Sequence, residues 1–325
     1  MPDYECSNSD FYTTISESYD PEIVSDLEIY LYLTPLHVQT QADQKGKFFF
    51  LYSQKEKGSP LALFQCSNDE KSWFSPSHAP FGSIQFFPGC MPDEINFFLH
   101  CIARYIREQG GTRLTIRHYP NCYLKTTGDL VNDSYLFYGF TIAEKLINHY
   151  IPVSSKTFAD VIRNMEKRRL AKCVNQNFSS GLDIETTAKK AYAFLSFCRS
   201  KKGYGMSLDE AQLTELITTF PKEILIFSVK QNGLVIALSV TVRVNKRVLY
   251  NFLTDSLPEY NAFSPSVLLL QCIYNYCQKE KIEILDLGTS LDHHGSEKAG
   301  LVRFKDNMGG VRSWKVTYSK DFFRI

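Results

Sequence analysis

The C-terminal third of this 325-residue sequence holds a carboxylate within an apolar run and a lysine after an aromatic residue. Asp286 lies in the apolar run 284–287, and Lys305 follows Phe304 in a segment of charged and apolar residues. A carboxylate can take up or release a proton in acid–base chemistry, and a lysine can neutralise a phosphate or stabilise a developing negative charge. Asp286 is therefore a candidate base, since burial moves carboxyl groups toward proton transfer near neutral pH.

Both residues also have a structural interpretation. Asp286 could cap the turn that begins at Gly288, and Lys305 could be one solvated helix lysine among many. A second candidate base is Asp255, which closes the predicted strand 248–254 and could equally be a turn residue. These alternatives stay open at the level of sequence.

A predicted helix start supplies candidates for phosphate binding. Ser264 can cap the helix, and Pro265 suits its first turn. Free N–H groups and the dipole at a helix N-terminus favour a phosphate, so Ser264 and Ser266 are candidates for binding a phosphate-bearing cofactor. Tyr260, just before the helix, is assigned to the substrate cleft. Arg303 lies two residues before Lys305, so on a helix the two side chains face different sides. Contact with a phosphate is the functional interpretation of Arg303.

Other polar features are weaker. His293 and His294 lie in a loop, but adjacent side chains rarely converge on one ion and no third ligand has matching spacing, so no metal site is predicted. His78, in the proline-rich loop 75–82, is placed at an inter-domain cleft or on the surface. The basic residues at 163–169 could contact a nucleotide, lipid-linked or tRNA phosphate, and a solvated helix face is the alternative.

Composition narrows the class of protein. Apolar residues make up 44% and charged residues 22% of the chain, as in soluble globular proteins. The net charge of +1 gives no general attraction to nucleic acid, so no DNA partner is expected. No stretch reaches the ~20 apolar residues of a transmembrane helix. The nine cysteines, an odd number without C-x-x-C spacing, favour reduced thiols, and we expect a cytoplasmic protein.

Hydrophobic periodicity predicts an α/β order. In the first half, residues 1–25 are expected to be loosely packed, and residues 93–109 to form a helix. Extended segments are predicted at 27–33, 47–52, 61–65, 83–87, 113–117, 135–138 and 145–153. In the second half, helices are predicted at 155–170, 185–199, 208–219, 265–281 and 297–308. A β-meander is predicted at 224–230, 234–244 and 248–254, with later strands at 283–287 and 314–318.

A weak internal repeat indicates two domains. Shifting the sequence by 171 residues aligns Cys101 with Cys272 and Leu114 with Leu285, so helix-to-strand spacing is the same in both halves. We therefore predict two similar α/β domains, residues 1–153 and 154–325.

The order of elements resembles the second half of a GNAT acyltransferase pair, and the whole chain resembles the FemAB-type tandem GNAT enzymes. These include peptidoglycan bridge-forming aminoacyl transferases and coenzyme A-using relatives. The loop Ala79-Pro80-Phe81-Gly82 resembles a signature of the first domain. The second-domain residues that carry the resemblance are Ser264-Pro265, Leu268-Leu269-Leu270, Asp286-Leu287-Gly288, Gly300-Leu301, Phe304-Lys305 and Gly309-Gly310.

The resemblance implies two tandem GNAT-like domains, each with a mixed, mostly antiparallel sheet flanked by helices. It implies an N-acyltransferase that moves an acyl or aminoacyl group from acyl-CoA or aminoacyl-tRNA to an amine, on a small molecule or a cell-wall precursor. Lys305, Asp286 and Asp255 would be catalytic. Tyr260 and the loop residues His78, Phe81 and Gly82 would line the substrate cleft. In this fold two strands usually splay so that a backbone N–H meets the acyl carbonyl.

Two departures keep other functions open. Residues 260–265 contain no glycine where acetyl-CoA-using relatives have a glycine-rich phosphate loop. Acyl-CoA is thus a candidate co-substrate without a sequence signal, and no tightly bound cofactor is expected. The chain also lacks the long helical arm frequent among aminoacyl-tRNA users, which leaves tRNA as the weaker alternative. A non-catalytic GNAT-derived binding or scaffold protein is the second hypothesis, and a membrane-associated lipid transferase the third.

Overall fold

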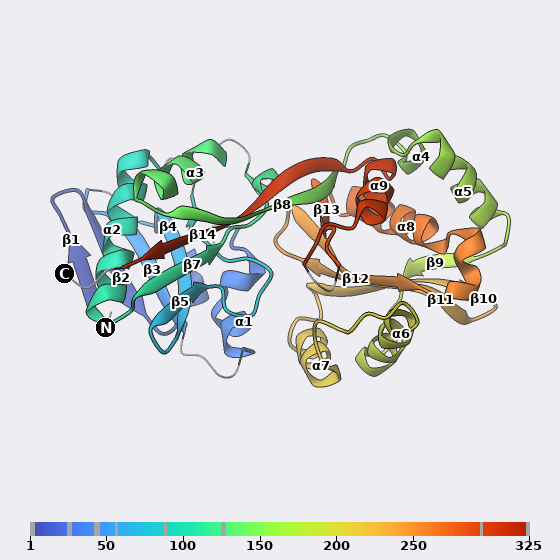
Figure 1. Ribbon diagram of the computed structural model, residues 1–325, viewed down its shortest axis with the longest axis horizontal. Coiled ribbons are helices and arrows are strands. Elements are labelled where there is room, and N and C mark those ends of the chain that lie inside the picture. The colour runs from blue at the N-terminus through green and yellow to red at the C-terminus, as the bar shows by residue number, and fades with distance from the viewer. Residues whose placement is uncertain are drawn as a thin grey trace. The chain divides into compact units, whose positions relative to one another are not determined.

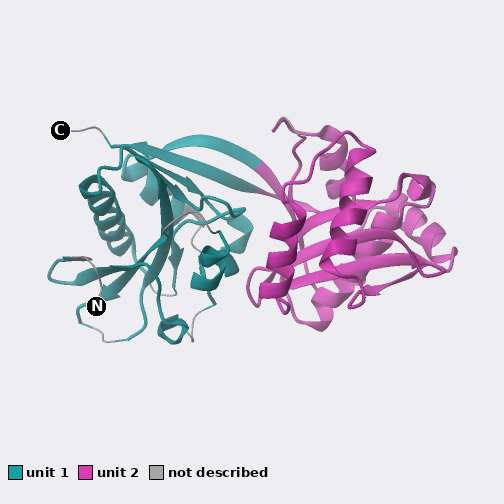
Figure 2. Ribbon diagram, turned by 90° about the horizontal axis from the view of Figure 1, so that it is seen from below, with its two compact units in different colours: residues 1–146, 314–325 teal, residues 147–313 magenta. Residues whose placement is uncertain are grey.

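Two units make up the chain in the computed structural model, which describes residues 4–24, 28–41, 46–55, 58–87, 90–124, 128–292 and 295–322. Contacts group residues 1–146 with 314–325 as unit 1, and residues 147–313 as unit 2 (Figure 2). The strands β8 (Thr141–Pro152) and β14 (Val311–Asp321) carry the chain from one unit to the other. The C-terminal segment, which the sequence places in the second domain, thus belongs by its contacts to unit 1.

The sheet of unit 1 has the strand order β1-β2-β3-β4-β5-β7-β14, and β6 pairs with β4 (Figure 1). Neighbouring strands are antiparallel except β5 and β7, which are parallel. This mixed, mostly antiparallel pattern is the predicted one. The bounds are β1 Tyr4–Ser7, β2 Phe11–Ser16, β3 Gly46–Ser53, β4 Ala62–Asp69, β5 Ser72–Ser75, β6 Gln85–Phe86 and β7 Arg113–Arg117.

The helix α2 (Pro92–Glu108) packs against this sheet along one apolar face. Its buried residues recur every three or four positions, the spacing that places them on one side of a helix; among them are Ile95, Phe98, Leu99, Ile102 and Ile106. Gly110, with a φ of 74°, follows the helix and permits the left-handed turn that ends it. The predicted helix 93–109 is therefore confirmed.

Three predictions for unit 1 are wrong. The segment expected to be loose forms β1 and β2, and Ile15 is 1% exposed within the sheet. Residues 135–138, expected to be extended, lie in or just after the helix α3 (Gly128–Phe137), where the buried Val131 and Tyr135 are one helical turn apart. The strand predicted at 27–33 is replaced by a 3-10 turn at Leu31–Leu33, residue 27 lying outside the described ranges. A short apolar run does not distinguish these conformations.

The sheet of unit 2 has the order β8-β13-β12-β11-β10-β9, with β12 and β13 parallel and the other pairs antiparallel. The predicted meander is confirmed as β10 (Ile224–Gln231), β11 (Leu234–Arg243) and β12 (Val248–Ser256). Its first turn has Asn232 and Gly233 at φ values of 48° and 83°, as a tight hairpin turn requires. The remaining strands are β9 (Ser179–Leu182) and β13 (Ile284–Thr289).

Helices cover both faces of the unit 2 sheet. Figure 1 shows α4 (Phe158–Val161), α5 (Asn164–Val174) and α8 (Pro265–Lys279) on one side, and α6 (Ala188–Ser200) and α7 (Glu210–Thr219) on the other. The helix α9 (Ala299–Asn307) follows β13 in the chain. No helix within the described ranges is both long and apolar enough to cross a bilayer.

The single helix predicted at 155–170 is wrong, because the chain breaks it into α4 and α5. Ile162 and Arg163 are extended, with ψ values of 157° and 155°. The N–H of Arg163 donates to the carbonyl of Asn307 at 2.9 Å, so a tertiary partner replaces the carbonyl one helical turn earlier. On α5, Arg169 pairs with the buried Glu166 at 2.9 Å.

The loop that follows β5 is packed into unit 1. Phe81 is 2% exposed and lies edge-on to the rings of Tyr30, Tyr32, Tyr119 and Tyr123. The N–H of Gly82 donates to the carbonyl of Arg117 at 2.9 Å. A Cβ atom on Gly82 would lie 2.7 Å from the backbone nitrogen of Pro76, closer than real Cβ atoms come to backbone. Glycine is thus required here by packing.

We predict that Gly82→Ala lowers the stability of unit 1 by about 1–3 kcal/mol, because the added methyl group forces backbone to move. Thermal unfolding followed by circular dichroism measures the effect. Gly58→Ala is the matched control in the same unit, since nothing lies within 4 Å of its Cβ position. Equal melting temperatures for the two variants would contradict the packing role.

Candidate active site in unit 2

The parallel strands β12 and β13 separate part way along their length. Their register pairs end at Tyr250 opposite Asp286. Beyond this point β13 continues beside β8, with Gly288 opposite His149, while β12 continues beside β11 as far as Ser256. The two strands therefore diverge and leave a wedge between them, which is the splay expected of this fold.

A β-bulge in β12 lies at the same place. Val240 of β11 pairs with Leu253, and the next residue, Thr241, pairs with Asn251, so Phe252 is the extra residue. A bulge interrupts the ladder and leaves its extra residue unpaired. The backbone of Phe252 is thereby released from regular pairing where β12 borders the wedge.

The wedge contains a cavity of about 260 Å³. Most of its wall is apolar, and its polar side chains include two cations, Arg199 and Lys305. The lining residues come from α6, β12, α8, β13, α9 and the loop after β13: Arg199, Tyr250, Asn251, Phe252, Thr254, Ser266, Leu269, Leu270, Ile273, Leu287, Gly288, Thr289, Leu291, Leu301, Phe304 and Lys305.

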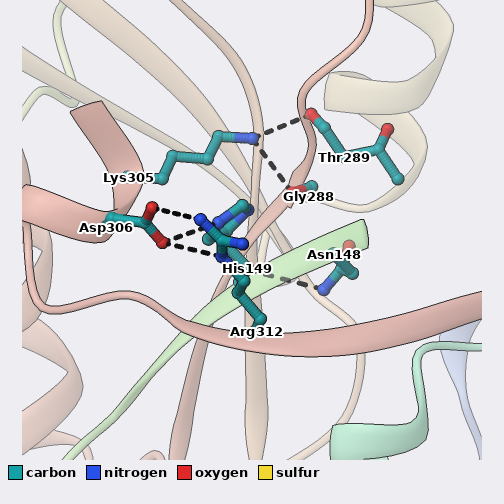
Figure 3. A network of polar contacts seen from close by, with 7 residues as sticks. All are labelled: Asn148, His149, Gly288, Thr289, Lys305, Asp306 and Arg312. Atoms are coloured by element: carbon teal, nitrogen blue, oxygen red, sulfur yellow. Dashed lines mark hydrogen bonds and ion pairs between the residues drawn. The ribbon is translucent and has the colours of Figure 1, made fainter. Parts of the chain in front are cut away.

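Lys305 is the buried cation of this cavity, with 7% of its surface exposed. Its Nζ donates to the carbonyls of Gly288 at 2.9 Å and Thr289 at 2.8 Å (Figure 3). Burial lowers the pKa of Lys305 to about 8, and the nearby charge of Asp286 opposes this shift. An ammonium has three N–H donors, so one remains after the two carbonyls are bound. Lys305 can therefore give up or accept a proton near physiological pH.

Asp286 lies behind the cavity wall, 2% exposed. Its Oδ1 accepts hydrogen bonds from Asn148 Nδ2 and from the N–H of Gly288, both at 2.8 Å. The second bond is the turn cap of the structural interpretation. The charge of Asp286 also acts to raise the pKa of Lys305, so Asp286 can affect the lysine without itself lining the cavity.

A histidine–carboxylate–arginine network adjoins Lys305, and the sequence did not indicate it. His149 is fully buried, and its Nε2 lies 3.2 Å from Asp306 Oδ1 (Figure 3). Arg312 Nη2 donates to Asp306 Oδ2 at 2.6 Å, and this bond is the main cause that lowers the pKa of Asp306. Burial and the charge of Lys305 lower the pKa of His149, so its neutral form is favoured. The three residues come from β8, α9 and β14, which no local pattern connects.

Only some of the other site residues predicted for the second domain lie at the cavity. Ser266 lines the cavity, whereas Arg303 is exposed on another face of α9. Ser264 precedes α8 with a φ of 57° and makes no capping hydrogen bond. Asp255 is bound to Lys202 Nζ at 2.5 Å and is not part of the cavity wall. Tyr260 packs edge-on against Phe178 and in a tilted arrangement against Phe263, and it does not line the cavity.

The first-domain candidates lie in unit 1 and are not among the residues that line this cavity. Phe81 and Gly82 belong to the packed loop described above, and His78 is exposed. His293 and His294 lie outside the described residues. Among the residues that are described, no group of three or more histidine, cysteine or acidic side chains is placed to hold a metal ion.

Several cavity residues have no motif in the sequence. Arg199, at the end of α6, reaches the cavity from a helix on the opposite side of the sheet from α8 (Figure 1). Asn251 and Thr254 are brought there by the bulged strand β12. The alternation of β12 could have identified its polar residues, but Arg199 carried no signal.

The two α/β units and the splayed strands define a tandem GNAT fold of FemAB-like type. A structure of FemX is similar to this chain with a TM-score of 0.72 at 10% identity, over 95% of this chain and 97% of that one. A tandem GNAT protein from the clavulanic acid biosynthesis pathway has a TM-score of 0.57 at 9% identity, over 97% and 99%. The C-terminal domain of a putative lysylphosphatidylglycerol synthetase from Agrobacterium fabrum has 0.58 at 11%, over 94% and 93%.

No protein-family model matches the sequence, and no curated protein matches it. At these identities the structural likeness shows the fold.

We predict that the stability of the wild type relative to Lys305→Met rises by up to about 3 kcal/mol between pH 8 and pH 10.5. The folded pKa of Lys305 is lowered to about 8 from 10.5. Below pH 8 both states carry the proton, and the penalty of burying the charge is fully present. Between the two values only the unfolded state keeps the proton, so rising pH favours the folded state.

Denaturant unfolding at a series of pH values measures this difference. Lys279→Met, at an exposed position in the last turn of α8, is the control and should show no such rise. A pH-independent difference for Lys305→Met would mean that the amine is not desolvated in the folded protein.

Proposed function

We propose that the protein is an N-acyltransferase whose activated acyl donor binds in the unit 2 cavity and whose acceptor is an amine. The observation that carries the proposal is the coincidence of three features at one place. The strands β12 and β13 separate there, Phe252 is bulged out of the ladder, and the buried Lys305 borders the opening.

The acyl carbonyl is proposed to lie in the wedge beside Phe252. When the amine attacks, a carbon–nitrogen bond forms and the carbonyl oxygen becomes an oxyanion. A backbone N–H that is free of the ladder, together with the remaining N–H of Lys305, can stabilise this charge. Catalysis would rest on positioning and on these preorganised donors, with the proton of the attacking amine passing to water.

Lys305 also suits the departure of the leaving group. A thiolate leaving group has an ordinary pKa of about 8.5, and the lowered pKa of Lys305, about 8, lies close to it. An ammonium matched in this way can transfer its proton as the carbon–sulfur bond breaks. Since a ribose hydroxyl holds its proton far more tightly, this match favours a thioester such as acyl-CoA over aminoacyl-tRNA as the donor.

The helix α8 can contribute to binding the donor. Pro265 lacks an N–H, and Ser264 does not cap the helix with its side chain, so the N–H of Ser266 is a donor near the cavity. Arg199 adds a positive charge for an anionic carrier group. A cell-wall precursor or a small amine remains the proposed acceptor, and tRNA remains the weaker alternative for the donor.

A non-catalytic binding protein is the second candidate. The observation that favours it is the segment before α8, which forms a 3-10 helix at Pro258–Phe263 without any glycine to approach a pyrophosphate. On this hypothesis the cavity binds a ligand without turnover.

We expect Lys305→Ala to lower kcat/KM for acyl transfer by at least about 100-fold, because an oxyanion donor and the leaving-group acid are both lost. The assay follows thiol release from acyl-CoA in the presence of amino sugars, amino acids or a UDP-linked muropeptide. Lys279→Ala should retain full activity. If the wild type turns over no donor with any acceptor, and Lys305→Ala changes only the melting temperature, the non-catalytic hypothesis replaces this one.

A further inference from the structure

We infer that the cavity of unit 2 selects an uncharged, apolar acyl chain of about six to ten carbons, and excludes acyl groups that carry an ammonium. This inference rests on the proposed function, since it names the donor class for the same cavity. The inference distinguishes two classes of donor, the fatty acyl thioester and the aminoacyl ester, between which the fold alone does not decide.

Apolar side chains form the walls from three elements. From α8 come Leu269, Leu270 and Ile273, between 1% and 5% exposed. Leu287 of β13 and Phe304 of α9 close other sides. Each methylene of a chain buried against such a wall strengthens binding about fourfold. An acetyl group would leave most of this surface without contact.

Charge distinguishes an acyl from an aminoacyl group. The two charged side chains among the lining residues, Arg199 and Lys305, are both cationic, and no carboxylate is among them. The carbonyls of Gly288 and Thr289, which could accept from an ammonium, already bind Lys305. An ammonium placed here would lose its water without gaining a partner of opposite charge.

The nearest carboxylate behind the wall does not change this conclusion. Asp286 is 2% exposed, and its Oδ1 accepts from Asn148 and from the N–H of Gly288. Lys305 lines the cavity and Asp286 does not, so a ligand in the cavity contacts the positively charged side chain and not the carboxylate.

The size of the cavity sets the expected chain length. An apolar cavity of about 150 Å³ lined by leucine, isoleucine and phenylalanine accommodates benzene, which has six carbons. The volume here is about 260 Å³. The same packing gives room for roughly six to ten carbons.

Binding of three thioesters of N-acetylcysteamine tests the inference without requiring coenzyme A or an acceptor. The acetyl, octanoyl and 8-aminooctanoyl thioesters share one leaving group, and the last two differ only by a terminal ammonium. Calorimetric titration of the wild type should show octanoyl binding at least about 30-fold more tightly than either of the others. Equal affinities for octanoyl and 8-aminooctanoyl, or for octanoyl and acetyl, would overturn the inference.

Ile273→Trp places an indole in the cavity and should weaken octanoyl binding at least about tenfold. Asn275→Trp, exposed on the same helix, is the control and should bind octanoyl like the wild type. Melting temperatures verify that both variants fold. An Ile273→Trp protein that folds and binds octanoyl at wild-type affinity would show that the chain lies elsewhere.

Transfer assays separate this inference from the proposed function. Selective octanoyl binding with no acylation of any amine would remove the enzyme assignment and leave the cavity's selectivity in place. Transfer of acetyl or aminoacyl groups as efficiently as octanoyl would confirm the enzyme and overturn the selectivity. Absence of binding by all three thioesters would overturn the inference directly.

Discussion

The bonds from one buried amine to the end of β13 are the interaction on which the site depends. Lys305 donates to the carbonyls of Gly288 and Thr289, just where β13 no longer pairs with β12. Buried carbonyls need a hydrogen-bond partner, and here a side chain from α9 supplies it. The strand can therefore end beside a cavity instead of beside another strand. The same bonds bring a titratable cation to the cavity wall.

Holding this amine requires a particular balance of charge around it. Asp286 favours the protonated form, whereas burial opposes it and has the larger effect. The charge of Lys305 helps to lower the pKa of His149, whose Nε2 lies beside Asp306, and Arg312 donates to the same carboxylate. Burial and the charge of Asp286 thus set the protonation of Lys305, and residues of β8, α9 and β14 form the network beside it, so the candidate chemistry is a property of the assembled unit.

The residues that carry the family resemblance serve different purposes in the two units. In unit 1, Phe81 and Gly82 are held by aromatic packing and by the close approach of backbone, and this accounts for their residue types without a ligand. In unit 2, Gly288 has a φ of 70°, and Lys305 faces a cavity. A motif that follows from fold alone is therefore weak support for a binding role, whereas a buried charge beside a cavity calls for a chemical explanation.

The sequence by itself determined what short-range physics controls. Alternating apolar residues and the Asn232–Gly233 turn specified the meander, and Pro265 marked the start of α8. The Phe304–Lys305 pair directed attention to the cavity through family resemblance. Only the tertiary structure decided the bulge at Phe252, because strand register depends on pairing between distant segments.

Long-range packing likewise placed residues 135–138 in or just after the helix α3, and it divided the helix predicted at 155–170 into α4 and α5. It also brought Arg199 and His149 to the site, although neither lies in a motif. The reason is general: periodicity and capping act over a few residues, while burial, strand register and the pKa of a side chain depend on neighbours that may lie more than a hundred positions away in the chain. For this protein, local sequence patterns determined most of the order of helices and strands. The pKa and the hydrogen bonds of Lys305 depend on the folded surroundings of the side chain.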